Sequence, residues 1–284
     1  MAKKYYSLYQ HIRYPDNQMP VLVQRWRERF TSWSIKKNFP RFGHHLDVEC
    51  QFIFQGKGSY FSEGQEYKFE RDSFLFFSPY DCHLCRPEPD VQLDKIALIF
   101  RRKYYAEILE EIRFFEGLPH YIKMSYAESS TARILLNKIM AEQSQKQMLL
   151  AESIRNKISE LLILVKRASQ RPQLPVKTNP LVSQMLIWME AHFLESISVA
   201  VMAEHFGYSA DYLTRCLKQS LGIGIKNYLL QRRVAEAKRI LESRPGIKID
   251  AIAEIVGFCN YNVFNRAFKI IVGSTPSAYR GFYH

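Results

Sequence analysis

A short pattern of residues occurs twice near the C-terminus of this 284-residue chain, about fifty residues apart. Each copy contains an alanine, a glycine, an arginine, a lysine, a second glycine and a tyrosine: Ala203, Gly207, Arg215, Lys218, Gly222 and Tyr228, then Ala253, Gly257, Arg266, Lys269, Gly273 and Tyr279. The first two pairs are offset by 50 and the others by 51, so the second copy has one extra residue after its first glycine. A repeat of this length with glycine between amphipathic segments is typical of paired helix-turn-helix units, which bind DNA.

Each copy predicts two short helices around its first glycine. Apolar residues between Val199 and Phe206 have the i, i+3, i+4, i+7 spacing of a buried helical stripe, and residues 249–256 repeat this spacing. We expect Gly207 and Gly257 to end these helices, because glycine readily adopts positive φ. The two predicted units span about residues 198–220 and 249–271, and a helix over 225–243 joins them.

The second helix of each unit carries polar side chains on its outer side. The candidate DNA-binding residues are Ser209, Asp211, Thr214, Arg215 and Lys218 in the first unit, and Asn260, Asn262, Asn265, Arg266 and Lys269 in the second. Arginine can pair with guanine, asparagine with adenine and lysine with phosphate. Ser209 and Asn260 also stand where helix N-caps are expected. As an alternative, Arg215 and Arg266 brace their own units through ion pairs or caps.

The composition permits a nucleic-acid partner but does not locate its site. The formal net charge is +12, which favours an anionic partner. Residues 181–284 hold 12 basic and 8 acidic residues, so the positive charge is not concentrated there. The chain has no run of eighteen apolar residues, and we expect no membrane span. Five cysteines without a framework spacing favour the reducing cytosol.

The N-terminal half predicts a different architecture. Residues 20–100 read as short strands separated by turns, which indicates a small β-barrel or sandwich. From about Tyr104 the apolar spacing becomes helical. A continuous apolar stripe predicts a helix packed on the barrel, with a seam between two subunits as the alternative: Ile154, Ile158, Leu161, Leu162 and Val165. Three prolines within residues 169–180 indicate a linker.

Residues 181–284 resemble the AraC/XylS-type transcription regulators. The second copy carries the family pattern most fully, in Ile252-Ala253-x-x-Val256-Gly257-Phe258, Phe264-x-Arg266-x-Phe268-Lys269 and Gly273-x-Thr275-Pro276-x-x-Tyr279-Arg280. Residues 259–263 depart from the family, which usually has serine or aspartate and another serine there; this bears on base preference and not on the fold. The resemblance implies sequence-specific binding of double-stranded DNA and control of transcription, with RNA polymerase as a partner.

Residues 35–100 resemble the cupin-type sensing barrel of many such regulators, through His44-His45-x-x-x-Glu49, Gly56-x-Gly58, Asp72 and Pro79-x-x-x-His83. The resemblance implies a small-molecule effector, a sugar or related metabolite. The candidate effector-binding residues are Trp26, Trp33, His45, Glu49, Tyr60 and His83, with core packing as the alternative for the aromatic ones. His45, Glu49 and His83 also suggest a metal site. However, adjacent strand residues point to opposite faces, and the usual His-x-His is missing, so we predict no metal and no cofactor.

These features together predict an α+β chain. A cupin-like ligand-sensing and dimerisation domain spans residues 1–168, a linker spans 169–180, and an all-α DNA-binding domain of two helix-turn-helix units spans 181–284. We expect a cytoplasmic, homodimeric regulator and not an enzyme. Two alternatives stay open: a metal-dependent cupin enzyme with an appended helical domain, and a constitutive DNA-binding protein whose barrel only dimerises.

Overall fold

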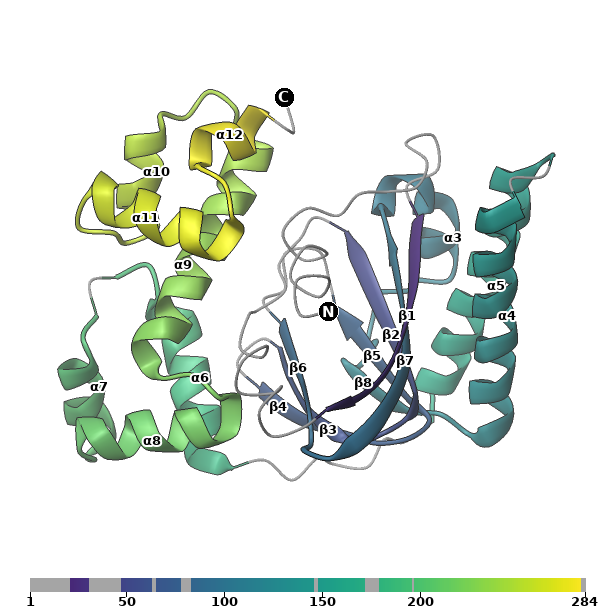
Figure 1. Cartoon of the computed structure of the whole chain (residues 1–284), viewed down its shortest axis with the longest axis horizontal. Helices are drawn as coiled ribbons and strands as arrows, with labels where there is room; N and C mark the ends of the chain where they lie inside the picture. Colours follow the sequence, from purple (N-terminus) through teal and green to yellow (C-terminus); the bar gives the residue numbers. More distant parts are fainter. Residues whose placement is uncertain are drawn as a thin grey trace.

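The computed structural model describes residues 21–30, 47–62, 65–77, 83–145, 148–171, 179–195 and 197–281. Its N-terminal half consists of two antiparallel β-sheets with helices packed against them, and its C-terminal half is helical (Figure 1). The predicted α+β fold, with a sheet domain followed by a helical domain, is therefore confirmed.

Two sheets form the N-terminal half. The larger sheet has the order β1 (Val21–Phe30), β7 (Val91–Phe100), β2 (Val48–Gln55), β5 (Ser73–Phe77) and β8 (Tyr121–Lys123). The smaller sheet has the order β4 (Gln65–Phe69), β3 (Gly58–Ser62) and β6 (His83–Pro87). Every strand pair is antiparallel. Among the described strands, β3 and β4 are the one neighbouring pair that is consecutive in the sequence, whereas the neighbours in the larger sheet are joined by longer crossovers.

Both faces of strand β2 are buried, and they face different cores. Cys50 and Phe52 belong to a core that the larger sheet shares with the long helices. Ile53 instead joins Tyr60 and Cys85 of the smaller sheet in a core between the two sheets. Since side chains alternate along a strand, the larger sheet separates a helix-covered face from an interior that faces the smaller sheet.

Helices cover the outer face of the larger sheet. They are the 3-10 helix η1 (Arg102–Tyr104), α3 (Ala106–Glu111), α4 (Tyr126–Gln145) and α5 (Leu150–Ser169). The predicted stripe of α5, from Ile154 to Val165, is buried in the core beneath these helices. The stripe therefore packs within one chain, as predicted, and is not available as a seam between chains.

The helical half contains seven helices among the described residues. They are α6 (Pro180–His192), α7 (Val199–Phe206), α8 (Ala210–Leu221), α9 (Ile225–Ser243), α10 (Ile249–Ile255), α11 (Tyr261–Val272) and α12 (Pro276–Gly281). Pro180, placed in the predicted linker, is the first residue of α6, because proline fits the first helical turn and the Asn179 side chain caps it. Residues 172–178 of that linker lie outside the described residues.

The helical half has two separate apolar cores, and α9 contributes to both. Its first half places Ile225, Tyr228 and Leu229 in a core with α6, α7 and α8. Its second half places Val234 and Leu241, among others, in a core with α10, α11 and α12. The long helix predicted over residues 225–243 is therefore present with these bounds and joins the two units.

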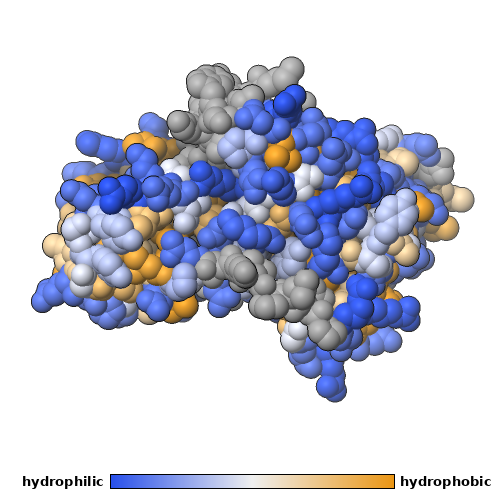
Figure 2. All heavy atoms as spheres, turned by 90° about the horizontal axis from the view of Figure 1, so that it is seen from below, coloured by the Kyte–Doolittle hydropathy of each residue, from blue (hydrophilic) through white to orange (hydrophobic). Residues whose placement is uncertain are grey.

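The surface seen from below is mainly hydrophilic, with apolar residues in small groups between polar ones (Figure 2). Within the described parts of the chain, no helix combines the length and the apolar character needed to cross a bilayer.

Candidate DNA-binding surface and effector site

Each helix-turn-helix unit pairs a short helix with a longer one, and each helix buries one side and exposes the other. Helix α7 precedes α8 in the first unit, and α10 precedes α11 in the second. Gly207 and Gly257 follow the short helices with φ values of 68° and 82°, so the predicted glycine turns are present in both units. Only Gly257 is also crowded, because a Cβ there would lie 2.5 Å from the carbonyl oxygen of Leu194.

Helix α8 presents most of the predicted residues of the first unit to solvent. Asp211, Arg215 and Lys218 are exposed, whereas Thr214 is only partly exposed. Ser209 is the N-cap, and its hydroxyl accepts a hydrogen bond from the backbone N–H of Tyr212 at 3.2 Å. The hydroxyl acceptor of Ser209 is thus engaged with its own helix, and three charged side chains remain for a ligand on the outer face.

Helix α11 repeats this arrangement with different side chains. Asn262, Arg266 and Lys269 are exposed, and the Asn260 side chain caps the helix by accepting from the N–H of Val263 at 2.9 Å. Asn265 differs from them, because its Oδ1 is fully buried and has no hydrogen-bond partner among the described residues. Asn265 is therefore turned partly into the protein and is the weakest of the ten candidates for base contact.

The alternative role of the two arginines, bracing their own units, receives no support from the described contacts. Arg215 and Arg266 form no ion pair among the described residues. The side-chain contacts within each unit are made instead by the repeated tyrosines, Tyr228 and Tyr279. The Tyr228 hydroxyl donates to Glu190, which Arg232 also contacts at 2.7 Å, and the Tyr279 hydroxyl donates to Glu242. The repeated tyrosines therefore hold each unit together from inside.

Sequence reasoning missed a group of aromatic residues beside α8. Tyr208 and Tyr212 are 48% and 37% exposed, and their rings stack with centroids 5.2 Å apart. The Arg215 guanidinium lies 5.6 Å from the centroid of the Tyr212 ring, within the range of a cation–π contact. The sequence shows two tyrosines four positions apart around the start of α8, but it does not show that their rings stack. The corresponding position in α11 is Val263, so Arg266 has no such aromatic neighbour there.

The interior between the two sheets contains a buried chain of polar groups. Glu49 and His83 lie 3.2 Å apart, with exposed side-chain fractions of 0% and 3%. Gln51 donates to Glu49 at 2.6 Å, and Lys95 donates to Gln51 at 2.9 Å. These groups come from strands β2, β6 and β7. Burying charged groups is unfavourable unless they are paired, so such a cluster marks a candidate functional site.

Aromatic residues lie at both ends of this polar chain. The Lys95 ammonium is 5.0 Å from the centroid of the Trp26 ring, and the His83 ring is 3.8 Å from that of Phe77. Phe77 packs edge-on against Tyr60 at 4.7 Å. Four of the six predicted effector residues thus belong to one connected set: Trp26, Glu49, Tyr60 and His83. Trp33 and His45 lie outside the described residues.

Of the three candidate metal ligands, the structure describes Glu49 and His83. The described residues contain no group of three or more His, Cys, Asp or Glu side chains that could hold a metal ion. The third candidate ligand, His45, lies outside them. Burial, with the Glu49 carboxylate nearby, raises the pKa of the Cys50 thiol well above its ordinary value, and burial also raises the pKa of Cys85. Both thiols are therefore protonated at neutral pH and poor nucleophiles.

Comparison with known proteins matches each half of the chain to a family model. Residues 29–158 match the AraC-like ligand binding domain, and residues 202–281 match a helix-turn-helix domain. The chain is 22% identical over 251 residues to the HTH-type transcriptional regulator YfiF of Bacillus subtilis, covering 84% of this chain and 78% of that one. It is 24% identical over 245 residues to the HTH-type transcriptional activator RhaS of Escherichia coli O6:H1, covering 82% and 84%. These relatives are transcription regulators and not enzymes.

Proposed function

The chain belongs to the AraC family of DNA-binding transcription regulators, and from this premise we propose that a small polar metabolite, bound between its two sheets, controls its DNA binding. The observation that supports the effector site is the buried chain of Glu49, His83, Gln51 and Lys95. Carboxylate, imidazole, amide and ammonium groups together can bind several hydroxyls, and the rings of Trp26 and Tyr60 can cover the apolar face of a sugar.

Helices α8 and α11 are the proposed reading helices. Their exposed residues differ, with Asp211 and Arg215 in one and Asn262 and Arg266 in the other. Helix α9 has 19 residues, which gives roughly 28 Å, close to the roughly 34 Å between successive major-groove faces. Each protomer therefore reads a bipartite, non-palindromic site, with one half for each unit.

We further propose that the protein acts as a cytoplasmic homodimer that contacts RNA polymerase. The relative RhaS is named an activator, and a direct contact with the polymerase is one way for a DNA-bound protein to activate transcription. Since the α5 stripe is buried, the interface must use other residues, and Ile134 on the outer side of α4 is 52% exposed. Sedimentation equilibrium of Ile134→Glu and the unmodified chain tests this interface, and an unchanged dimer would exclude Ile134 from it.

Selection of duplexes from a random library by the full-length protein tests the DNA-binding function. We expect a bipartite consensus whose affinity falls as salt rises, because lysine and arginine displace counterions from the phosphates. A variant with both Arg215→Ala and Arg266→Ala should lose the consensus. If the unmodified protein enriches no sequence over bulk DNA, the proposed function is wrong.

Thermal unfolding with aldoses, alditols and sugar acids tests the effector site. A compound that binds the folded protein raises its melting temperature by mass action. The shift should vanish in Glu49→Gln and His83→Gln but persist in Ser129→Ala. Ser129 is the matched control because it is also a buried polar residue, bonded to Asp72 outside the space between the sheets. A shift that survives both interior substitutions would place the effector elsewhere.

A further inference from the structure

The smaller sheet contacts only one of the two helix-turn-helix units through a shared core. Phe61 of β3 and Leu84 of β6 are both 2% exposed and belong to the apolar core of the first unit, together with residues of α6, α8 and α9. In Figure 1 this sheet lies between the larger sheet and the helical half. The core of the second unit is formed by residues of α9 to α12 and their connecting segments, with no residue from a strand.

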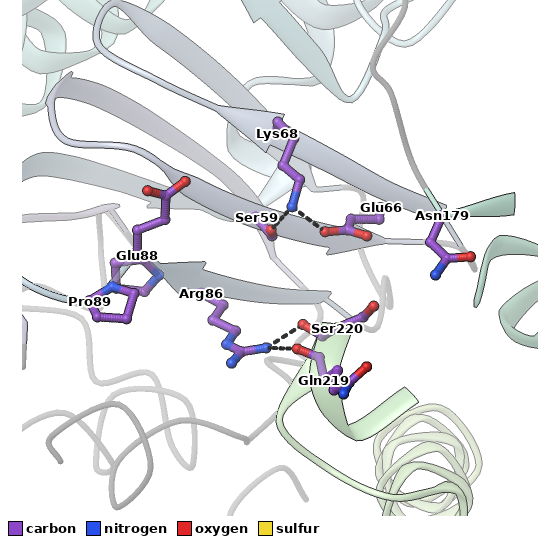
Figure 3. A pocket seen from close by; sticks show the side chains of 10 residues that line it. Ser59, Glu66, Lys68, Arg86, Glu88, Pro89, Asn179, Gln219 and Ser220 are labelled. Atoms are coloured by element: carbon purple, nitrogen blue, oxygen red, sulfur yellow. Dashed lines mark hydrogen bonds and ion pairs between the residues drawn. The ribbon is translucent and has the colours of Figure 1, made fainter. Parts of the chain in front are cut away.

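Arg86 of β6 makes a polar contact beside this apolar one. Its Nη1 donates to the carbonyl oxygens of Gln219 at 2.8 Å and of Ser220 at 2.5 Å, both in the last turn of α8 (Figure 3). Carbonyls in the last turn of a helix lack partners within the helix, and they sit at the negative end of its dipole. The backbone N–H of Gly222 donates to the carbonyl oxygen of Lys218. Arg86 donates to the next two carbonyl oxygens, those of Gln219 and Ser220. The strand thus caps the first reading helix.

A polar cleft of about 370 Å³ lies at this junction. It is lined by Arg86 and Lys68 from the sheet and by Asn179, Gln219 and Ser220 from the helical half, among others (Figure 3). Lys68 is bonded within the sheet, to Ser59 and Glu66 at 2.7 Å each. Arg86 is therefore the cation of this cleft that joins the two halves. Burial lowers the pKa of its guanidinium, which still remains charged at neutral pH.

Strand β6 has two faces with different partners. His83 and Cys85 point into the space between the sheets, where His83 contacts Glu49 and Phe77. Leu84 and Arg86 point outward, into the core and onto the helix end of the first unit. This alternation follows from the two-residue period of a strand. One strand of five residues therefore separates the candidate effector site from the first reading helix.

We propose that β6 couples the interior of the sensing domain to the first reading helix, and that Arg86 is the positioning residue that fixes the orientation of α8. This inference rests on the proposed function, and it names the strand through which the effector controls DNA binding. An effector that contacts His83 shifts β6, and the shift moves Leu84 and Arg86 because they belong to the same short strand. The effector then favours the arrangement of α8 in which it binds best. No described strand contributes to the core that contains α11, and Ile270 at the corresponding end of α11 is 65% exposed.

Hydrogen exchange of the full-length protein without DNA tests the coupling directly. Arg86→Ala should raise the exchange rate of the last turn of α8 by about tenfold, the effect of losing a hydrogen bond to a charged group. His83→Gln should also change exchange there, although the His83 side chain points into the space between the sheets, toward Glu49 and Phe77. Lys68→Ala is the matched control, because Lys68 lines the same cleft but, among the described residues, its hydrogen bonds go to Ser59 and Glu66 of the sheet. Should His83→Gln destabilise the sheet, Glu49→Gln gives the same test.

The exchange experiment has three clear outcomes. Faster exchange in α8 for both Arg86→Ala and His83→Gln, with α10 to α12 unchanged, supports the coupling. No change in α8 for Arg86→Ala overturns the role of Arg86. A change for Arg86→Ala but none for His83→Gln or Glu49→Gln overturns the connection to the interior.

Selection of duplexes, analysed base by base, shows whether Arg86 positions helix α8 or only stabilises the folded protein. Arg86→Ala should alter base preference by about tenfold in one half of the bipartite site and leave the other half unchanged. Arg86→Lys should restore only part of it, because an ammonium lacks the planar fork of guanidinium. Equal loss at both halves would overturn the positioning role. Failure of the unmodified protein to select any sequence would refute the proposed function instead, while the DNA-free exchange result would still stand.

Discussion

The two helix-turn-helix units share a scaffold but differ in their surroundings. Both have a capped reading helix, a glycine turn and a buried tyrosine bonded to a glutamate. The first unit shares its core with the smaller sheet, and its arginine lies beside stacked tyrosines. The second unit closes its core with its own residues and has a valine in place of the tyrosine. The repeated residues therefore build the same fold twice, whereas the contacts outside the repeat differ between the two units.

The largest expected difference between the units concerns their glycine turns. Gly257→Ala should destabilise the protein by roughly 3 to 5 kcal/mol, because a Cβ both strains a positive φ and meets the Leu194 carbonyl at 2.5 Å. Gly207→Ala should lose only about 1 kcal/mol, since nothing lies within 4 Å of its Cβ. Urea unfolding of both full-length variants measures the difference. Equal losses would show that the turns are interchangeable.

Removal of either reading arginine should affect a different half of the DNA site. Arg215→Ala and Arg266→Ala should each lower specific affinity by roughly 1–3 kcal/mol, with a smaller effect on bulk DNA, if each side chain contacts a base. Fluorescence anisotropy with matched specific and scrambled duplexes gives both values. Equal losses on the two duplexes would assign the arginine to phosphate contact.

The buried tyrosines should differ in their contribution to stability. Tyr279→Phe should destabilise the protein by about 2 kcal/mol, because Glu242 is buried and loses its tyrosine donor. Tyr228→Phe should lose about 1 kcal/mol, since Glu190 retains two hydrogen bonds from Arg232. Urea unfolding again measures both, and a larger loss for Tyr228→Phe would reverse the comparison.

An exchange of side chains tests the stacked tyrosine. Tyr212→Val should weaken specific binding by about 0.5–1 kcal/mol, as the Arg215 guanidinium loses its cation–π neighbour, and Tyr212→Phe should retain most of the affinity. Val263→Tyr should strengthen the preference of the second unit by a similar amount. Competition binding with single-base variants of the selected duplex measures these changes. If Tyr212→Phe and Tyr212→Val weaken specific binding equally, the cation–π role of Tyr212 is disproved.

The smallest effects should come from the lysines, and here the units should agree. Lys218→Ala and Lys269→Ala should each reduce the slope of log affinity against log salt by about 0.9, on every sequence, because one phosphate contact is lost. Titrations at four salt concentrations measure this slope. A slope that stays constant in either variant would remove that lysine from the interface.

Local sequence signals located the helices of the repeat well. Helix α9 has the predicted bounds, because glycine and proline-glycine segments interrupt the helical pattern on both sides. Ser209 and Asn260 are N-caps, as their short polar side chains indicated. The α5 stripe was correctly placed on the sheet. Each of these features depends on residues a few positions apart, which is the range over which helix propensity and capping act.

The candidate sites were predicted less completely. Glu49 and His83 were predicted from the family resemblance. Gln51 and Lys95 complete the buried group of polar side chains but were not predicted, because only the pairing of the strands brings them together. Asn265 looked equivalent to its neighbours until its carbonyl oxygen proved buried. Tyr212 was missed because a tyrosine in an amphipathic helix gives no local sign of stacking on another ring.

A sheet domain followed by a duplicated pair of helices could be predicted from the amino-acid sequence alone, because periodicity, glycine turns and caps are properties of short segments. The folded chain was needed to show that the smaller sheet packs against the first helix-turn-helix unit. Arg86 lies 133 residues before Gln219, on a strand whose local pattern carries no sign of that contact. The packing of two strands and a helix end brings these groups together, so the difference between the two units is a property of the folded chain.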